Sequence, residues 1–160
     1  MSEPFIQQID QLAAAVNAKI SRPRKGETFV EVDQGKVREF ISRLVNEVHV
    51  THLATITGLD LGQNLGVIYH FIREGDWVQV KTLVPKATPA TKSIVDIVPG
   101  AILYEMEVHD MIGLTFDGNP WINQKLLLPD NWPADLPPPL LKSSKADTIR
   151  KRLRLEVERK

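Results

Sequence analysis

Proline is unevenly distributed along this chain, since eight of its eleven prolines lie at or after residue 89. Proline lacks a backbone N–H, fixes φ and restricts the residue before it, so it interrupts both helices and sheet ladders. The stretch from Gly113 to Leu141 also shows little hydrophobic periodicity. We therefore predict an extended proline-rich arm in this stretch, and we expect most of the regular structure to precede it.

The first half of the chain predicts alternating helices and strands. Apolar residues recur at three- and four-residue steps over residues 5–16 and 36–48, which indicates two amphipathic helices, with Asp33 placed to cap the second. The residues from Ser21 to Gly26 are expected to interrupt the helical pattern after the first of these helices. Segments rich in β-branched and aromatic residues predict four strands: Thr28–Val32, His49–Leu59, Leu65–Arg73 and Trp77–Val84. This order favours an α+β fold, with helices packed on one face of a small, mostly antiparallel sheet.

The second half of the chain predicts three further segments. Thr91 to Val98 and Gly100 to Met111 are expected to be helical pieces separated by Pro99. Ser143 to Lys160 is highly charged, and either forms a helix against a partner or frays. We accordingly divide the chain into an α+β domain (1–98), a signature helix with the arm (99–142) and a charged tail (143–160).

Composition excludes several classes of function. Twenty basic and twenty acidic residues give a formal net charge of +0, so no bulk attraction to nucleic acid or to an anionic membrane is expected. The basic tail has no aromatic residues among its charges to stack bases. Cysteine is absent, which removes disulfides and thiol nucleophiles. No apolar run approaches the roughly 20 residues of a membrane span, and residues 1–20 lack signal-peptide features. We predict a cytoplasmic protein that reaches a membrane only through other subunits.

Acidic residues gather on the predicted helix that ends near Met111. Glu105 and His109 are four residues apart, with Asp110 adjacent, but a metal site needs further ligands that converge on them. The remaining histidines all lie on predicted strands: His49, His52 and His70. Glu107 with His109 or Asp110 is also conceivable as a general acid and base, although no nucleophile or oxyanion donor is identifiable. A structural role for these carboxylates, pairing with basic groups in this chain or on a partner, is favoured over both.

The arm carries large apolar side chains, Trp121, Leu126 to Leu128 and Trp132. A proline-fixed arm does not easily bury so many of them in its own small domain. Rigid segments lose little entropy on binding, and exposed apolar arms usually mark contact surfaces. The segment is thus predicted to be a binding surface, with an arm packed on its own domain as the alternative.

The residues from Ile94 to Trp132 resemble the signature of the 30 kDa (C) subunit family of respiratory complex I and the related membrane-bound NiFe hydrogenases and sulfur reductases. That pattern runs Glu-Arg-Glu, two residues, Asp-Met-Phe-Gly, Phe-x-Gly-His-Pro, and a leucine-rich run closing in Pro-Glu-Asp-Trp. Met106, Ile112 and Asn119 depart from it. The matching residues, in order, are Glu105, Glu107, Asp110, Met111, Gly113, Phe116, Gly118, Pro120, Leu127, Leu128, Pro129 and Trp132.

The resemblance implies a non-catalytic structural subunit without cofactor or metal. It implies a place in the peripheral arm of an ion-pumping, membrane-bound oxidoreductase, on the cytoplasmic side. There the subunit is expected to pack against the large catalytic subunit, in a complex that also holds iron–sulfur subunits. The departures favour the hydrogenase and sulfur-reductase branch over a quinone-reducing NADH dehydrogenase-type complex. A free-standing enzyme using Glu107, His109 and Asp110 is the alternative from another class.

The same resemblance assigns roles to the interface residues. Glu105, Glu107 and Asp110 are expected to orient the interface through charge-assisted hydrogen bonds. Gly113, Gly118 and Pro120 would fix the turn. The residues expected to dock the arm on the partner are Leu127, Pro129 and Trp132, with Phe116 completing the predicted interface.

Overall fold

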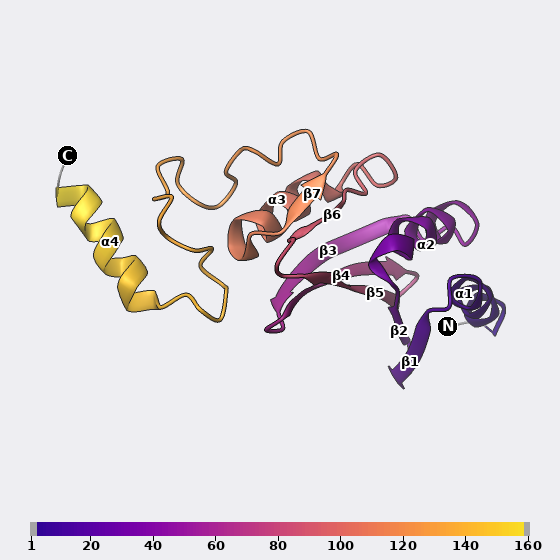
Figure 1. The fold of residues 1–160 in the computed structure, drawn as a ribbon. Coiled ribbons are helices and arrows are strands. Elements are labelled where there is room, and N and C mark those ends of the chain that lie inside the picture. Colours follow the sequence, from indigo (N-terminus) through magenta and orange to yellow (C-terminus); the bar gives the residue numbers. More distant parts are fainter. Residues whose placement is uncertain (1–2, 159–160) are drawn as a thin grey trace.

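The computed structural model describes residues 3–158 and has the predicted α+β fold (Figure 1). Five strands form the main sheet in the order β1-β2-β5-β4-β3, and β6 pairs with β7 in a second, two-stranded sheet. The first elements are α1 Glu3–Ala15, β1 Lys19–Arg24, β2 Glu27–Glu31, α2 Gln34–Asn46, β3 His52–Asp60, β4 Asn64–Arg73 and β5 Asp76–Pro85. The remaining elements are β6 Ala90–Lys92, α3 Ala101–Ile112, β7 Thr115–Asp117 and α4 Ala146–Glu158.

The main sheet is mostly antiparallel, as predicted. β3, β4 and β5 form consecutive antiparallel pairs, and β1 pairs antiparallel with β2. The predicted turn between β4 and β5 is tight because Glu74 and Gly75 both have positive φ, 53° and 87°, which is the backbone of a type I′ hairpin. One pairing is parallel: β2 lies beside β5, so that Val30 is opposite Val80.

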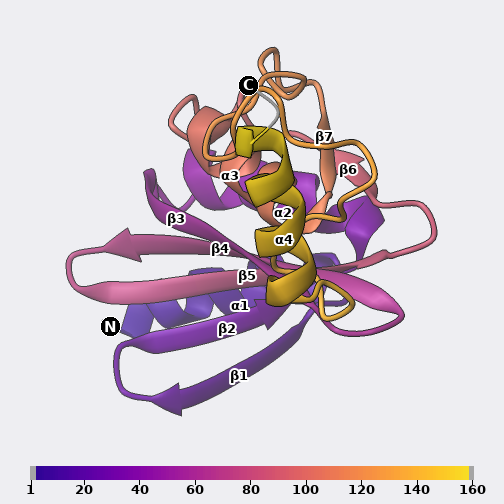
Figure 2. The same ribbon diagram turned by 90° about the vertical axis from the view of Figure 1, so that its left-hand side faces the viewer.

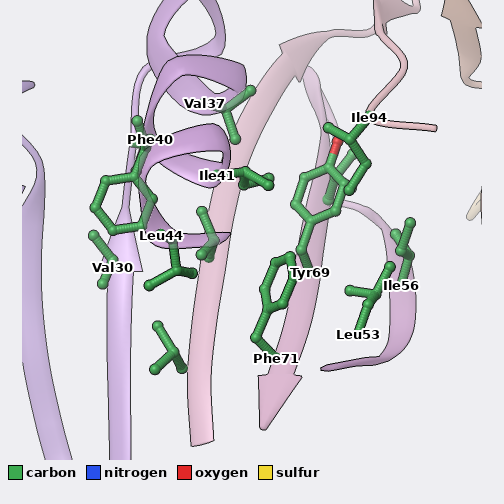
Figure 3. Close-up of a cluster of buried hydrophobic side chains, with 14 of the residues drawn as sticks. Val30, Val37, Phe40, Ile41, Leu44, Leu53, Ile56, Tyr69, Phe71 and Ile94 are labelled. Carbon is green, nitrogen blue, oxygen red and sulfur yellow. The ribbon is translucent and has the colours of Figure 1, made fainter. Parts of the chain in front are cut away.

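The hydrophobic core lies between one face of the sheet and the helices. Figure 2 shows α1 and α2 behind the strands. Figure 3 shows Phe40 of α2 beside Val30 of β2, and Ile41 of α2 directed toward Tyr69 of β4. Those side chains are almost completely excluded from water. The opposite face of the sheet carries none of the helices α1, α2 and α3.

The predicted N-terminal cap of α2 is wrong in its detail. The Asp33 side chain makes no capping hydrogen bond. Its backbone carbonyl instead accepts bonds from the N–H groups of Lys36 and Val37. α2 begins two residues earlier than predicted, at Gln34, whose side chain donates to the carbonyl of Ala90 (2.7 Å).

The helix α3 packs directly on β3 because Gly58 lacks a side chain. A Cβ at Gly58 would lie 2.7 Å from Ile112 Cδ1 and 2.9 Å from Val108 Cγ1, which is too close for a real contact. Val108 and Ile112 belong to the same hydrophobic cluster as the sheet residues, and Phe116 of β7 joins it.

The division of the chain at residues 98 and 142 stays a prediction.

Three short segments differ from what the sequence pattern predicts. The pattern indicates a break at Ser21 to Gly26, yet β1 runs to Arg24 as an edge strand whose ladder shifts register between Ser21 and Arg24. The pattern indicates a helix at Thr91 to Val98, but β6 ends at Lys92 and turns follow it. β6 pairs in parallel with β7, a strand that the pattern does not predict. The strands β1, β6 and β7 form by pairing with other segments, and the local pattern of apolar residues does not indicate such pairing.

Residues 118–145 contain only turns, bends and irregular backbone. Trp121, Leu126 and Leu127 expose their side chains, whereas Leu136 is buried. α4 follows this segment and stands apart from the sheet and the other helices (Figure 1). An ion pair between Arg152 and Asp135 joins α4 to the irregular segment. Among the helices within residues 3–158, none is long and apolar enough to cross a membrane.

Candidate functional site

Glu105, in the first half of α3, is completely buried and holds three parts of the chain together. Its carboxylate accepts hydrogen bonds from Ser93 Oγ (2.7 Å), the backbone N–H of Ile94 (2.8 Å) and Asn119 Nδ2 (2.9 Å). Burial raises the pKa of Glu105, although these three bonds to the ionised form counteract it. Asn119 Nδ2 also donates to the carbonyl of Ile102 (3.0 Å), so the residue after Gly118 is fixed to the first turn of α3.

Asp110, in the last turn of α3, is the second buried carboxylate. Its Oδ2 accepts three consecutive backbone N–H groups, those of Leu126 (2.8 Å), Leu127 (2.8 Å) and Leu128 (3.1 Å). Lys125 Nζ lies 3.6 Å from Oδ1. Burial alone would raise the pKa of Asp110, but the three N–H groups and the charge of Lys125 lower it on balance. The carboxylate is thus held ionised, and it curves residues 126–128 around itself.

Asp60, at the end of β3, is a third carboxylate of this kind. Oδ2 accepts from Lys86 Nζ (2.6 Å) and from the backbone N–H of Lys142 (2.9 Å), while Oδ1 accepts from the N–H of Gly62 (2.9 Å). The ammonium of Lys86, followed by the two N–H groups, lowers the pKa of Asp60 to about 2. Asp60 therefore fastens the end of the irregular segment to the β3–β4 turn.

The segment 118–145 consequently runs along α3 and is fastened at its beginning, middle and end. Between the part bound by Asp110 and the part bound by Asp60, the segment also contacts the end of α3. There the N–H of Leu140 donates to the carbonyl of Met111 (2.9 Å). Gly113 ends α3 with φ 74°, and a Cβ there would lie 2.9 Å from Pro138 Cγ. Glycine is the residue that adopts this left-handed cap without strain. The backbone of the segment is therefore packed on its own domain. Several of its apolar side chains are nevertheless exposed.

The remaining predicted interface residues separate into buried and exposed groups. Phe116 is fully buried in the core and Trp132 is half-buried, with Nε1 3.4 Å from the carbonyl oxygen of Leu136. Leu127 exposes 57% of its surface, the largest fraction among the predicted residues with large hydrophobic side chains. Also exposed are Glu107, Gly118, Pro120 and Pro129. Direct contact with a partner is therefore open to the exposed group, whereas Glu105, Asp110 and Phe116 bond or pack within the chain.

The arrangement around His109 gives little support to a metal or acid–base site. His109 Nδ1 lies 3.0 Å from the carbonyl oxygen of Leu114, and Glu107 points to solvent. His49 and His52 are exposed, and His70 pairs with Thr57 Oγ1 (2.9 Å). Within residues 3–158, no three His, Cys, Asp or Glu side chains converge as metal ligands would.

Two residues of this site were not singled out by sequence reasoning for the roles they have. Asp60 precedes Gly62 in a hairpin turn, and an Asp two residues before a glycine is a recognisable turn signal; its bond to Lys142, 82 residues away, is not recognisable. Asn119 was noted only as a departure from a family motif. Its side chain donates to Glu105 and accepts from the N–H of Trp121 (2.9 Å), so it orders the start of the segment.

The fold and this site define a class of protein: an α+β domain that uses buried carboxylates to hold a shaped, partly apolar segment along one helix. Residues 30–149 match the family described as "Respiratory-chain NADH dehydrogenase, 30 Kd subunit". The chain therefore belongs to this family of 30 kDa (C) subunits of respiratory complexes, as the sequence resemblance predicted.

Individual relatives belong to complexes with different electron donors. The C subunit of NADH-quinone oxidoreductase from Acidothermus cellulolyticus is 28% identical over 147 residues, covering 81% of this chain and 76% of the relative. The C subunit of F(420)H(2) dehydrogenase from Methanosarcina mazei is 29% identical over 110 residues, covering 64% and 69%. The chain covers less than half of several other curated relatives, fused C/D subunits among them.

One solved structure resembles almost the whole chain. A chain of the membrane-bound sulfane sulfur reductase, an archaeal respiratory membrane complex, superposes with a TM-score of 0.80 at 26% identity. The likeness covers 95% of this chain and 91% of that chain. It therefore extends beyond the α+β domain.

Proposed function

We propose that this chain is a structural C subunit of a membrane-bound, ion-pumping oxidoreductase of the hydrogenase and sulfur-reductase branch. The observation that carries the proposal is the likeness to the sulfane sulfur reductase chain over 95% of the present chain. In this proposal the subunit binds no cofactor. It sits on the cytoplasmic side and reaches the membrane only through other subunits.

The surface that would dock on the large catalytic subunit follows α3. Seven large apolar side chains are exposed in the described part of the chain, and five of them belong to α3 or to the segment that runs along it. We call these five the signature surface: Leu103, Trp121, Leu126, Leu127 and Leu140. Exposed apolar side chains gathered along one helix are typical of protein–protein contacts, and tryptophan is enriched among the residues that dominate binding energy.

In this proposal the buried carboxylates act from inside. Glu105 and Asp110 would not touch the partner, but would hold the backbone that presents Trp121 and Leu127. A segment already ordered in the free subunit loses less conformational entropy when it binds. Glu107, Pro120 and Pro129 are exposed beside it and would complete the contact.

A second candidate is the C subunit of a quinone-reducing NADH dehydrogenase-type complex. The Acidothermus cellulolyticus relative, which belongs to an NADH-quinone oxidoreductase, covers 81% of the chain and favours it. Both candidates share the docking surface. They differ in the large catalytic partner, whose metal-ligand residues distinguish the two branches.

The test is purification of the tagged chain from its native membranes in mild detergent, with the partners identified by mass spectrometry. Recovery of a large catalytic subunit, iron–sulfur subunits and membrane subunits is expected, and the metal-ligand residues of the large subunit identify the branch. Recovery of the chain alone would refute the scaffold role and return attention to Glu107, His109 and Asp110.

The docking surface is tested with one variant on the signature surface and one control variant on α1. Trp121→Ser is expected to weaken recovery of the large subunit at least about 30-fold, since loss of a dominant interface side chain costs about 2 kcal/mol or more. Gln7→Ser is the control, because Gln7 is exposed on α1 and belongs neither to α3 nor to the segment that runs along it. Equal recovery with both variants would show that the signature surface is not the contact.

A further inference from the structure

The face of the sheet opposite the helices carries two hollows that the signature surface does not include. The first, of about 400 Å³, is lined by Phe29, Leu59, Leu61 and Ile68, with Lys19 and Lys81 at its edge. The second, also about 400 Å³, is lined by residues that include Arg24, His70 and Trp77. In Figure 2 this face is turned to the viewer, with α1 behind the strands. The chain thus presents a second partly apolar surface.

The polar side chains on this face are largely paired with one another. Lys81 Nζ donates to Glu31 (2.9 Å) and Thr57 Oγ1 lies 2.9 Å from His70 Nε2. Gln79 donates to Glu27. Because these groups already have partners, an apolar occupant can cover them without leaving a hydrogen-bonding group unsatisfied. Phe29, Leu59 and Ile68 are only half-covered, and Leu61 exposes 46% of its surface.

Positive charge exceeds negative charge around the two hollows. Four basic and two acidic side chains line them. Glu31 pairs with Lys81 and Glu27 with Arg24. Lys19 lies opposite Glu31 in the β1–β2 ladder, so two lysines share one glutamate at the first hollow, and one positive charge is in excess there. A partner with carboxylates flanking its apolar side chains complements this surface, and complementary charge favours a specific register of docking.

The shape of the face indicates a single protruding element rather than a flat surface. Five strands spaced about 4.8 Å apart span about 19 Å, which is the length of about 13 residues of a helix that lies across them at about 1.5 Å per residue. A hollow also suits a protruding segment better than it suits a flat lipid bilayer. The chain's own α4 stands on the same side of the molecule, clear of the sheet (Figures 1 and 2). It is a poor occupant, because Arg150, Lys151, Arg152 and Arg154 make it basic like the face itself.

We propose that the helix-free face of the sheet is a second docking surface, and that it receives an acidic amphipathic helix of another subunit of the same complex. The proposal rests on the proposed function, since the helix comes from that complex. The apolar side of the helix covers Phe29, Leu59 and Ile68, and its carboxylates lie against Lys19.

The experiment uses the absence of cysteine, which allows a single reactive thiol to be placed anywhere in the tagged chain. Leu61→Cys on the helix-free face and Leu103→Cys on the signature surface form a matched pair, because both leucines are 46% exposed. Each variant is incorporated into the complex in native membranes, treated with a short thiol-to-amine or thiol-to-carboxyl cross-linker, and the linked peptides are sequenced. Leu61→Cys is expected to link to an acidic, amphipathic segment of a subunit, and Leu103→Cys to the large subunit.

The two variants separate failure of this inference from failure of the proposed function. If neither variant assembles or links to another subunit, the scaffold role fails. If Leu103→Cys links to the large subunit while Leu61→Cys links to nothing, to lipid, to α4 or to a second copy of this chain, the docking face is refuted and the scaffold role stands.

A charge-reversal variant supplies an independent measurement. Lys19 is exposed at the start of β1, opposite Glu31, so Lys19→Glu adds a like charge there, and thermal unfolding checks that the variant keeps the fold. It should weaken retention of the subunit linked through Leu61 at least about tenfold, more at low salt than at high salt, and leave the large subunit bound. Lys151→Glu on α4, also exposed, is the matched control and should leave that retention unchanged. Unchanged retention in Lys19→Glu would overturn the acidic character assigned to the partner.

Discussion

Removing the Asp110 carboxylate tests whether it orders the segment beside α3. One oxygen of this side chain accepts three backbone N–H groups at 2.8, 2.8 and 3.1 Å, and the residue is only 1% exposed. A hydrogen bond to a charged group contributes about 1.5–3 kcal/mol. The three bonds share one acceptor, and in the opened segment water replaces them, so their sum is well below three full bonds. We expect Asp110→Ala to weaken the local structure by about 3 kcal/mol.

The assay is amide hydrogen exchange of the isolated subunit, followed by mass spectrometry or NMR. Since about 1.4 kcal/mol corresponds to a factor of ten, the amides of Leu126, Leu127 and Leu128 should exchange on the order of 100-fold faster in Asp110→Ala. Asp110→Asn keeps a neutral acceptor, which forms bonds of about half the strength, so a roughly tenfold acceleration is expected. The amides of β4 and β5 should keep their protection in both variants.

Glu107→Gln is the matched control. Glu107 lies on the same helix, three residues before Asp110, and is exposed. Its substitution should leave exchange at residues 126–128 unchanged. Unchanged exchange at these amides in Asp110→Ala would refute the conclusion that this carboxylate orders the segment, and equal acceleration in Glu107→Gln would point to a general charge effect on α3 instead.

Two further substitutions probe the other fastenings of the segment. Gly113→Ala places a Cβ 2.9 Å from Pro138 Cγ on a backbone with φ 74°, so thermal unfolding should show a free energy of unfolding lower by about 1–2 kcal/mol. Gly35→Ala is the control, because its Cβ meets nothing within 4 Å and its stability should not fall. Equal stability of the two variants would contradict the role of Gly113 as the helix cap. The pKa of Asp60 is lowered from its ordinary value of 3.8 to about 2. Its stabilisation is therefore present above pH 4 and lost as the pH falls towards 2, and Asp60→Asn should flatten the pH dependence of stability in that range, as followed by denaturant titration.

The sequence predicted the elements whose side chains repeat with a clear period. α2 buries Val37, Phe40, Ile41 and Leu44 at helical spacing, and these are four of the residues predicted for its apolar face. The antiparallel strands β3 to β5 are consecutive, so the turn at Glu74 and Gly75 was sufficient to order two of them. Local pattern was enough wherever the interacting residues are near in sequence.

The elements that were missed depend on distant partners. β1 has an almost fully exposed pattern with Pro23 within it, and it becomes a strand only because β2 pairs with it. The parallel pair β6 and β7 is 3 residues long on each side, and 22 residues separate Lys92 from Thr115, so no local periodicity reveals it. The bond of Asp60 to the N–H of Lys142 joins positions 82 residues apart. Family resemblance located the signature residues but did not distinguish those that bond inward from those exposed to a partner.

That distinction follows from the chemistry of the carboxylates. A buried carboxylate is costly unless several donors converge on it, and a partner protein could supply such donors only after binding. Here Glu105 and Asp110 already receive three donors each from this chain: Ser93, Ile94 and Asn119 for the first, and residues 126–128 for the second. An asparagine at position 110 would offer an uncharged oxygen, which is a weaker acceptor, to the same three N–H groups. Glu105 and Asp110 are therefore an internal frame for the segment beside α3, and in the proposed function the apolar side chains that this frame presents would make the contacts with a partner.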